Sequence, residues 1–233
     1  MVRASTEIIE RARAAAATLL EAAAKDLVYE APFFRISGTD RAISLFETAG
    51  AIESGKCCDE LNGKLEATHD FKGRIPAYPA GAAVCELEID PDTGLTRAVK
   101  YTAVNDFGTV INPLLVEGQI QGGVVQGLGQ VLLEGAVYDS DGQLVTGSFM
   151  DYAMPRAHDA PMIEVTNRPV PTKTNPIGAK GCGEAGTSGG LPAVANAVID
   201  ALSGYGIRHL EMPMTPARIW QAIQDAKRKQ SAL

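Results

Sequence analysis

The stretch NPIGAKGCGEAGTSGGLPAVANAVIDALSG, residues 175–204, joins a glycine-rich loop to an apolar segment. Six glycines fall within residues 178–190, and a single carboxylate, Glu184, stands among them. Glycine lets a backbone approach a ligand closely and adopt positive φ, but it is costly to order. Dense glycine around one acid therefore predicts a loop that binds a ligand or takes part in catalysis.

Common loop motifs do not explain this segment. Residues 181–186 match the dinucleotide pattern G-x-G-x-x-G, but a proline-flanked approach at 171–176 stands where such a fingerprint needs a buried strand. The Gly-Lys-Ser/Thr of a P-loop is absent, and no G-x-S-x-G elbow surrounds Ser188. Two interpretations of Glu184 stay open. It is either a carboxylate that complements a helix N-terminus or a general base held in a confined site.

The rest of the chain predicts strands in hairpins. Apolar residues alternate over 82–89, a PDTG turn follows, and a second strand over 96–105 returns antiparallel. A turn signal predicts a second hairpin at 136–145, and residues 162–166 form a further predicted strand.

Helices are predicted from apolar spacing and capping residues. Their predicted ranges are 5–25, a short helix from Ser44, 115–134, 193–202 with Pro192 in its first turn and Gly204 as its cap, and 217–229. Ser44 and Glu47 have the spacing of a capping box. Together with the hairpins, these helices predict an α+β fold with antiparallel or mixed sheets and helices packed on one side.

The predicted helix at 115–134 is rich in glycine and glutamine. Each glycine costs up to ~1 kcal/mol relative to alanine in a helix interior. Small residues four apart allow very close helix packing. The alternative is that one face lies against a polar ligand whose heterocycle edge is bound by glutamine amides. The glutamines are Gln119, Gln121, Gln126 and Gln130.

Composition is that of a soluble globular chain, with 233 residues, 45% hydrophobic and 21% charged. The net charge of −7 argues against non-specific binding to nucleic acid or anionic membranes. No stretch approaches the ~18 apolar residues of a membrane span. The alanine-rich N-terminus carries charges that a signal peptide lacks, so a cytoplasmic location is predicted.

The four cysteines show no C-x-x-C pair, which predicts free thiols rather than a metal site within this chain. The three histidines are scattered without ligand spacing. The cysteines are Cys57, Cys58, Cys85 and Cys182. Residues 50–79 mix glycine, proline and charge and predict a long loop or arm. We therefore divide the chain into an N-terminal helix, short strands and arm at 1–80, and a C-terminal domain at 81–233.

Several segments occur in an order that resembles the molybdenum hydroxylases, the xanthine dehydrogenase/aldehyde oxidase family. The resemblance is greatest to the C-terminal third of the large subunit of aerobic carbon monoxide dehydrogenases. A run of motifs in order is more specific than any one of them. The segments are VNDFGTVINPLLVEGQIQGGVVQGLGQVLLE at 104–134, TGSFMDYAMPRA at 146–157, NPIGAKG at 175–181 and GAKGCGEAGTSGGLPAVANAVIDAL at 178–202.

The resemblance implies that residues 81–233 are a molybdopterin-binding domain. The cofactor would be molybdenum-molybdopterin in its cytosine dinucleotide form. Glu184 would be the general base at molybdenum in the oxidation of a carbon centre with oxygen derived from water. The loop backbone would line the metal, and Gln126 would contact the pterin, with Gln119 and Gln121 in support. The implied cofactor-binding residues are Gln126, Lys180, Gly181, Cys182 and Gly183.

The resemblance also implies partners. Electrons would leave through 2Fe–2S centres to FAD on partner chains, and another chain would carry the rest of the molybdenum subunit. We expect a fragment or one part of a split subunit, inactive alone. The alternative is a non-catalytic remnant or assembly module of the same fold. Cys182 departs from the small aliphatic residue more usual in the family. Purines, aldehydes, N-heterocycles and CO all stay open as substrates.

Overall fold

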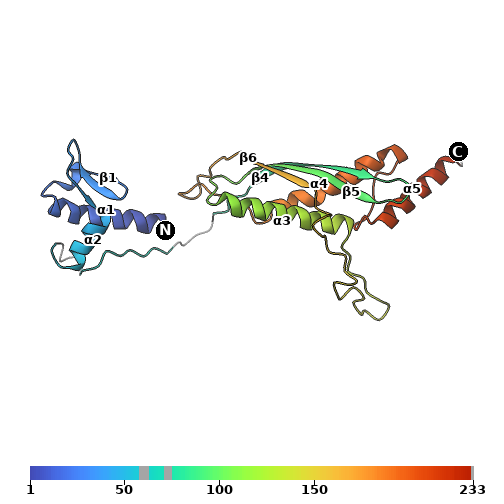
Figure 1. The fold of residues 1–233 in the computed structure, drawn as a ribbon, viewed down its shortest axis with the longest axis horizontal. Coiled ribbons are helices and arrows are strands. Elements are labelled where there is room, and N and C mark those ends of the chain that lie inside the picture. Colours follow the sequence, from blue (N-terminus) through green and yellow to red (C-terminus); the bar gives the residue numbers. More distant parts are fainter. Residues whose placement is uncertain (58–62, 71–74, 232–233) are drawn as a thin grey trace. The chain divides into compact units, whose positions relative to one another are not determined.

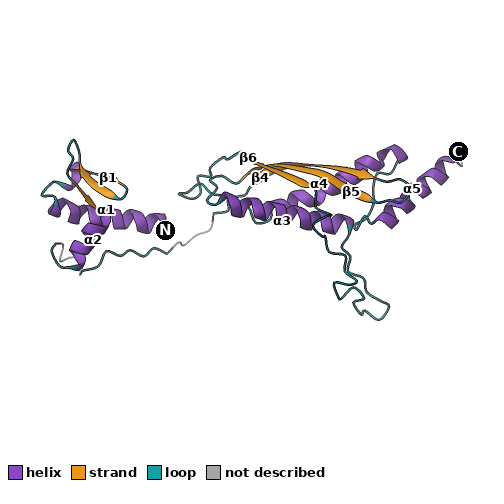
Figure 2. Ribbon diagram, viewed as in Figure 1, coloured by secondary structure: helices purple, strands orange, loops and turns teal. Residues whose placement is uncertain are grey.

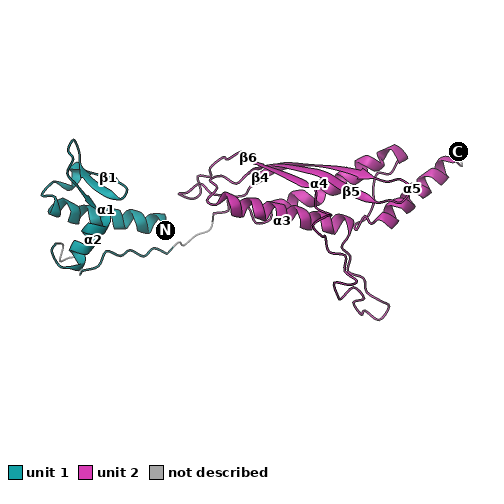
Figure 3. Ribbon diagram, viewed as in Figure 1, with its two compact units in different colours: residues 1–74 teal, residues 75–233 magenta. Residues whose placement is uncertain are grey.

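The structure, a computed structural model, describes residues 1–57, 63–70 and 75–231. The chain forms two compact units, Met1–Arg74 and Ile75–Leu233 (Figure 3). The sequence places the division at residue 80, where strand β4 begins. Cys58, one of the four cysteines predicted to be free thiols, lies outside the described residues.

The first unit packs a helix against a small sheet. Its elements are α1 (Val2–Leu19), β1 (Leu27–Glu30), β2 (Phe33–Ile36), β3 (Ala42–Ser44) and α2 (Leu45–Glu53). The strands are antiparallel in the order β1-β2-β3, and the alanine face of α1 packs on the fully buried Phe34. The predicted capping box at α2 is confirmed. The Ser44 hydroxyl accepts from Glu47 N at 3.1 Å, and the Glu47 carboxylate accepts from Ser44 N at 2.9 Å.

The second unit is a mixed sheet with helices on one side, and it confirms the predicted fold class (Figure 2). Its elements are β4 (Ala80–Ile89), β5 (Thr96–Asp106), α3 (Pro113–Leu132), β6 (Met162–Asn167), α4 (Ala185–Leu202) and α5 (Pro216–Ser231). In the order β4-β5-β6, β4 and β5 form the predicted antiparallel hairpin, and β6 lies parallel to β5. Figure 1 shows α3 and α4 running along this sheet.

Alternating burial fixes which face of the sheet meets the helices. On β4, Ala83 and Cys85 are half-buried, and their neighbours along the strand are exposed. They pack with Tyr101 of β5 and with Ile120 and Val124 of α3 in one apolar cluster. This is the period-two pattern that the sequence predicts for the strand.

Helices α3 and α4 touch through their backbones. A Cβ added to Gly123 would lie 2.7 Å from Thr187 N, and one added to Gly127 would lie 2.8 Å from Leu191 N. Both contacts advance by four residues in each helix, so the two helices run parallel. Close packing, one of the two interpretations of the glycine-rich helix, is therefore confirmed for these two glycines.

The prediction for the start of α4 is wrong. The helix begins at Ala185, and Pro192 lies inside it rather than in its first turn. Proline removes one helical hydrogen bond, and glycines weaken a helix locally. Packing against α3 stabilises this segment as a helix nonetheless. The predicted cap at Gly204 is also wrong, because a 3-10 turn follows α4 and the left-handed glycine is Gly206, with φ of 77°.

The segment after α3 leaves the layered core (Figure 1). The predicted hairpin at 136–145 is reduced to a single bridge between Tyr138 and Leu144. Its turn is confirmed, since Asp139 accepts hydrogen bonds from Asp141 N and Gln143 N, each 2.9 Å. No helix among the described residues is long and apolar enough to cross a membrane.

Candidate functional site

The loop before α4 is attached by its backbone to the end of β5. Phe107 O accepts a hydrogen bond from Lys180 N at 2.8 Å, and Gly178 O accepts one from Thr109 N at 3.0 Å. Gly178 and Gly108 have positive φ, 71° and 59°. A Cβ on Gly108 would also overlap Gly178 O. Only glycine fits without strain where the chain at Gly108 crosses the chain at Gly178. This close contact fixes where the loop begins.

Asp106, the last residue of β5, connects three segments of the chain. Its Oδ1 accepts from Gly108 N and from Val170 N, each at 2.9 Å. Its Oδ2 accepts from Lys180 Nζ at 2.6 Å, and the two side chains of this ion pair are only 16% and 15% exposed. The Lys180 ammonium, helped by the two backbone N–H groups, lowers the pKa of Asp106 from 3.8 to about 2.

This pKa gives a pH prediction. Because the folded-state pKa lies below the ordinary 3.8, the stabilisation by the carboxylate is present above pH 3.8 and lost as the pH falls through about 2. We expect Asp106→Asn to lower the free energy of unfolding most above about pH 4, with the difference shrinking toward pH 2. Urea denaturation of the wild-type chain and of Asp106→Asn between about pH 4 and pH 2 measures the two free energies of unfolding. The contributions of the other carboxylates are the same in both chains and cancel when one free energy is subtracted from the other. A constant difference down to about pH 2 would contradict the assignment.

A second attachment comes from α3. Gln119 Nε2 donates to Gly183 O at 2.8 Å, directly before Glu184. The family resemblance implies only a supporting role for Gln119 and assigns the pterin contact to Gln126. Gln126 is exposed on α3, about 10 Å further along the helix at 1.5 Å per residue. Within the described residues, no hydrogen bond joins Gln126 to the loop.

Glu184 is the N-cap residue of α4, and its backbone carbonyl accepts from Ser188 N at 2.8 Å. Its side chain makes no capping hydrogen bond, and the residue is exposed. The backbone therefore holds Glu184 in place, and its carboxylate is not used in a helix-capping hydrogen bond. Among the described residues, no group of three or more His, Cys, Asp or Glu side chains could hold a metal ion.

Four glycines near Glu184, which we call the open glycines, face empty space in the described part of the chain. A Cβ on any of them would meet no described atom within 4 Å, and none has positive φ. Two lie on α3 beside Gln119, and two lie in the loop before Glu184. They are Gly118, Gly122, Gly181 and Gly183. The backbone of α3 and of the loop before Glu184 is therefore not covered by side chains at these positions, so a bulky group could approach it closely.

Asp106 and its neighbour Asn105 are not among the site residues predicted from the sequence. Asn105 is 8% exposed, and its Nδ2 has no partner in the described part of the chain. A polar residue at the end of a half-buried strand, two positions before a glycine, is a recognisable signal, because Asp favours such turns by binding the backbone N–H two residues later. That signal marks a turn, but it does not identify Lys180 as the partner.

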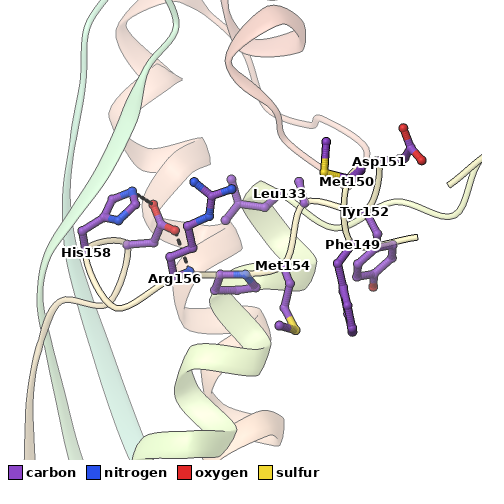
Figure 4. Close-up of a pocket in the computed structure, with 11 residues that line it drawn as sticks. Leu133, Phe149, Met150, Asp151, Tyr152, Met154, Arg156 and His158 are labelled. Carbon is purple, nitrogen blue, oxygen red and sulfur yellow. Dashed lines mark hydrogen bonds and ion pairs between the residues drawn. The ribbon is translucent and has the colours of Figure 1, made fainter. Parts of the chain in front are cut away.

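A separate hollow of about 420 Å³ lies beside the segment that follows α3 (Figure 4). Most of its lining comes from residues 149–156, which belong to one of the segments that carry the family resemblance. This segment is attached to the end of α3, where Tyr152 Oη donates to Glu134 at 2.5 Å. None of the predicted site residues lines the hollow.

Comparison with known proteins defines the class. The profile of the molybdopterin cofactor-binding domain matches residues 1–161. The chain is 37% identical over 224 residues to the 6-hydroxypseudooxynicotine dehydrogenase complex subunit gamma of Paenarthrobacter nicotinovorans, covering 95% of this chain and 28% of that protein. It is 35% identical over 225 residues to the carbon monoxide dehydrogenase large chain of Hydrogenophaga pseudoflava, with the same coverages of 95% and 28%.

A solved structure agrees. The reconstituted CO dehydrogenase from Oligotropha carboxidovorans superposes with a TM-score of 0.91 at 32% identity, covering 97% of this chain and 28% of that one. The chain therefore belongs to the molybdenum hydroxylase family, of carbon monoxide dehydrogenase type, as its motifs indicated. It spans 28% of the length of the two curated relatives.

Proposed function

We propose that this chain forms one wall of the active site of a molybdenum-dependent hydroxylase, with Glu184 as its general base. The chain is a molybdopterin-binding domain homologous to the large subunits of molybdenum oxidoreductases. Because it spans only 28% of those subunits, other polypeptide must supply the remaining walls.

The four open glycines carry this proposal. In a helix, Gly118 and Gly122 each cost up to ~1 kcal/mol relative to alanine, and no contact in the described chain offsets that cost. Bare backbone on α3 and on the loop, with an exposed carboxylate next to it, is what a large flat cofactor requires. A remnant that no longer binds cofactor has no use for these glycines.

Each residue then has a distinct task. The backbone of Gly181, Cys182 and Gly183 lies beside the metal, and the amide of Gln126 binds the pterin. Gln119 holds the Gly183 carbonyl, and so the position of Glu184. Glu184 accepts a proton in the reacting complex, as a carboxylate does when it lies within hydrogen-bond reach of its donor. The bound cofactor supplies the redox chemistry that oxidises the substrate carbon.

The assembly we propose contains the rest of the molybdenum subunit, a 2Fe–2S chain and an FAD chain, in the cytoplasm. The cofactor is the cytosine dinucleotide form, and the substrate is a small molecule. The relatives support an assembly, since one is named as a subunit of a dehydrogenase complex and another as a large chain.

Metal analysis tests the proposal. We expect molybdenum and pterin to co-purify with this chain when it is co-expressed with the polypeptide that carries the rest of the subunit, and neither to bind the chain alone. The control is the partner polypeptide purified without this chain. An assembled complex that contains no molybdenum would leave the non-catalytic remnant as the correct reading.

A further inference from the structure

We propose that Lys180 is a positioning residue that fastens the Glu184 loop to the end of β5 through Asp106, and that it does not bind the cofactor. This inference rests on the proposed function, because it concerns how the proposed base is held. The family resemblance alone placed Lys180 among the cofactor-binding residues.

The Lys180 ammonium already has a partner within this chain. Its Nζ lies 2.6 Å from Asp106 Oδ2, with both side chains about one-sixth exposed. In the described part of the chain, this is the least exposed ion pair. Turning Lys180 toward an outside anion would leave the enclosed Asp106 carboxylate without its cation, which is strongly unfavourable.

Asp106, the partner of Lys180, is itself held in place. The backbone N–H groups of Gly108 and Val170 bind its Oδ1, so its Oδ2 is presented in a fixed direction. Hydrogen bonds to an ionised acceptor are about twice as strong as neutral ones. The ion pair therefore joins the loop to two segments, one after β5 and one after β6, that are separate from it in sequence.

The loop that carries Glu184 is held at both of its ends. Two of the open glycines, Gly181 and Gly183, lie between Lys180 and Glu184. Glycine loses more conformational freedom on ordering than any other residue type. The ion pair holds the loop at Lys180, and Gln119 holds it at Gly183. A loop that leaves space for a large ligand needs attachments at both ends to keep Glu184 in one position.

Hydrogen exchange of the full chain tests the attachment directly. We expect Lys180→Met and Asp106→Asn each to speed amide exchange of residues 178–184 by about tenfold, the effect of losing one charge-assisted hydrogen bond. Asparagine keeps an oxygen for the two N–H groups at Asp106. The double variant should exchange no faster than either single variant, because the two residues act as a pair. Lys180→Arg should restore slow exchange.

The matched control is Lys100→Met, which breaks the ion pair between Lys100 and Glu164, 3.0 Å apart in the same sheet. It should leave exchange in 178–184 unchanged. Unaltered exchange in Lys180→Met, or additive effects in the double variant, would overturn the inference.

The assembled enzyme separates positioning from cofactor contact. Positioning predicts that Asp106→Asn and Lys180→Met lower kcat alike, with KM and the molybdenum and pterin contents unchanged. Direct contact predicts that Lys180→Met loses cofactor and Asp106→Asn retains it, and this result would refute the inference. If the assembly holds no molybdenum, the proposed function fails, and the exchange experiment on the chain still decides the role of the ion pair.

Discussion

Glu184→Gln is expected to lower kcat of the assembled enzyme by about 10²–10⁴-fold, the usual contribution of a general base. Glutamine has nearly the shape of glutamate but cannot accept the proton. Within the described chain the Glu184 side chain makes no capping bond, and the residue is held through its backbone. The substitution therefore should change the chemistry and leave the fold and the molybdenum content as they are.

The measurement is turnover together with metal and pterin analysis on the same preparation. Glu88→Gln is the control, because it removes the same charge from the exposed side of β4. Full turnover in Glu184→Gln, with molybdenum present, would show that Glu184 is not the base and that its carboxylate only complements the start of α4.

Sequence alone predicted those parts of the fold that depend on local pattern. The β4–β5 hairpin, the capping box at Ser44 and the helix α3 follow from periodicity and turn chemistry over a few residues. The start of α4 at Ala185 did not follow, because its glycines indicate a loop when considered locally. Tertiary contact, including that with α3 more than sixty residues earlier in the chain, stabilises that segment as a helix.

The same limit applies to the candidate site. Motifs in order pointed to Glu184 and to the cofactor class, and the relatives bear out the family. The partner of Lys180 could not be inferred, since Asp106 lies 74 residues away. Nor could the sequence separate glycines that the fold requires from glycines that it leaves open. Gly122 and Gly123 are neighbours in one helix, and the structure places them in opposite classes.

These neighbours allow a sharp test of the helix contact. We expect Gly123→Ala to lower the free energy of unfolding by about 1–3 kcal/mol, the cost of overpacking, because its Cβ would meet the backbone of α4 at Thr187. Gly122→Ala should raise it by up to about 1 kcal/mol, since alanine favours the helix and meets nothing. Urea denaturation of the two variants measures both values. Equal stabilities would mean that α3 and α4 do not touch through Gly123.

Gly122→Ala also separates the two reasons for glycine in α3. If the strip of α3 at Gly118 and Gly122 serves a bound cofactor, Gly122→Ala, although more stable as a free chain, should hold less molybdenum and pterin when assembled with its partners. Gly186→Ala gives the opposite comparison, because its Cβ would overlap the Ile120 carbonyl and weaken the helix contact in the free chain as well. A Gly122→Ala assembly with full cofactor content would show that the strip serves something other than the cofactor. A Gly122→Ala variant with a higher free energy of unfolding as a free chain and a lower cofactor content in the assembly would show that glycine at residue 122 serves the ligand and destabilises the fold.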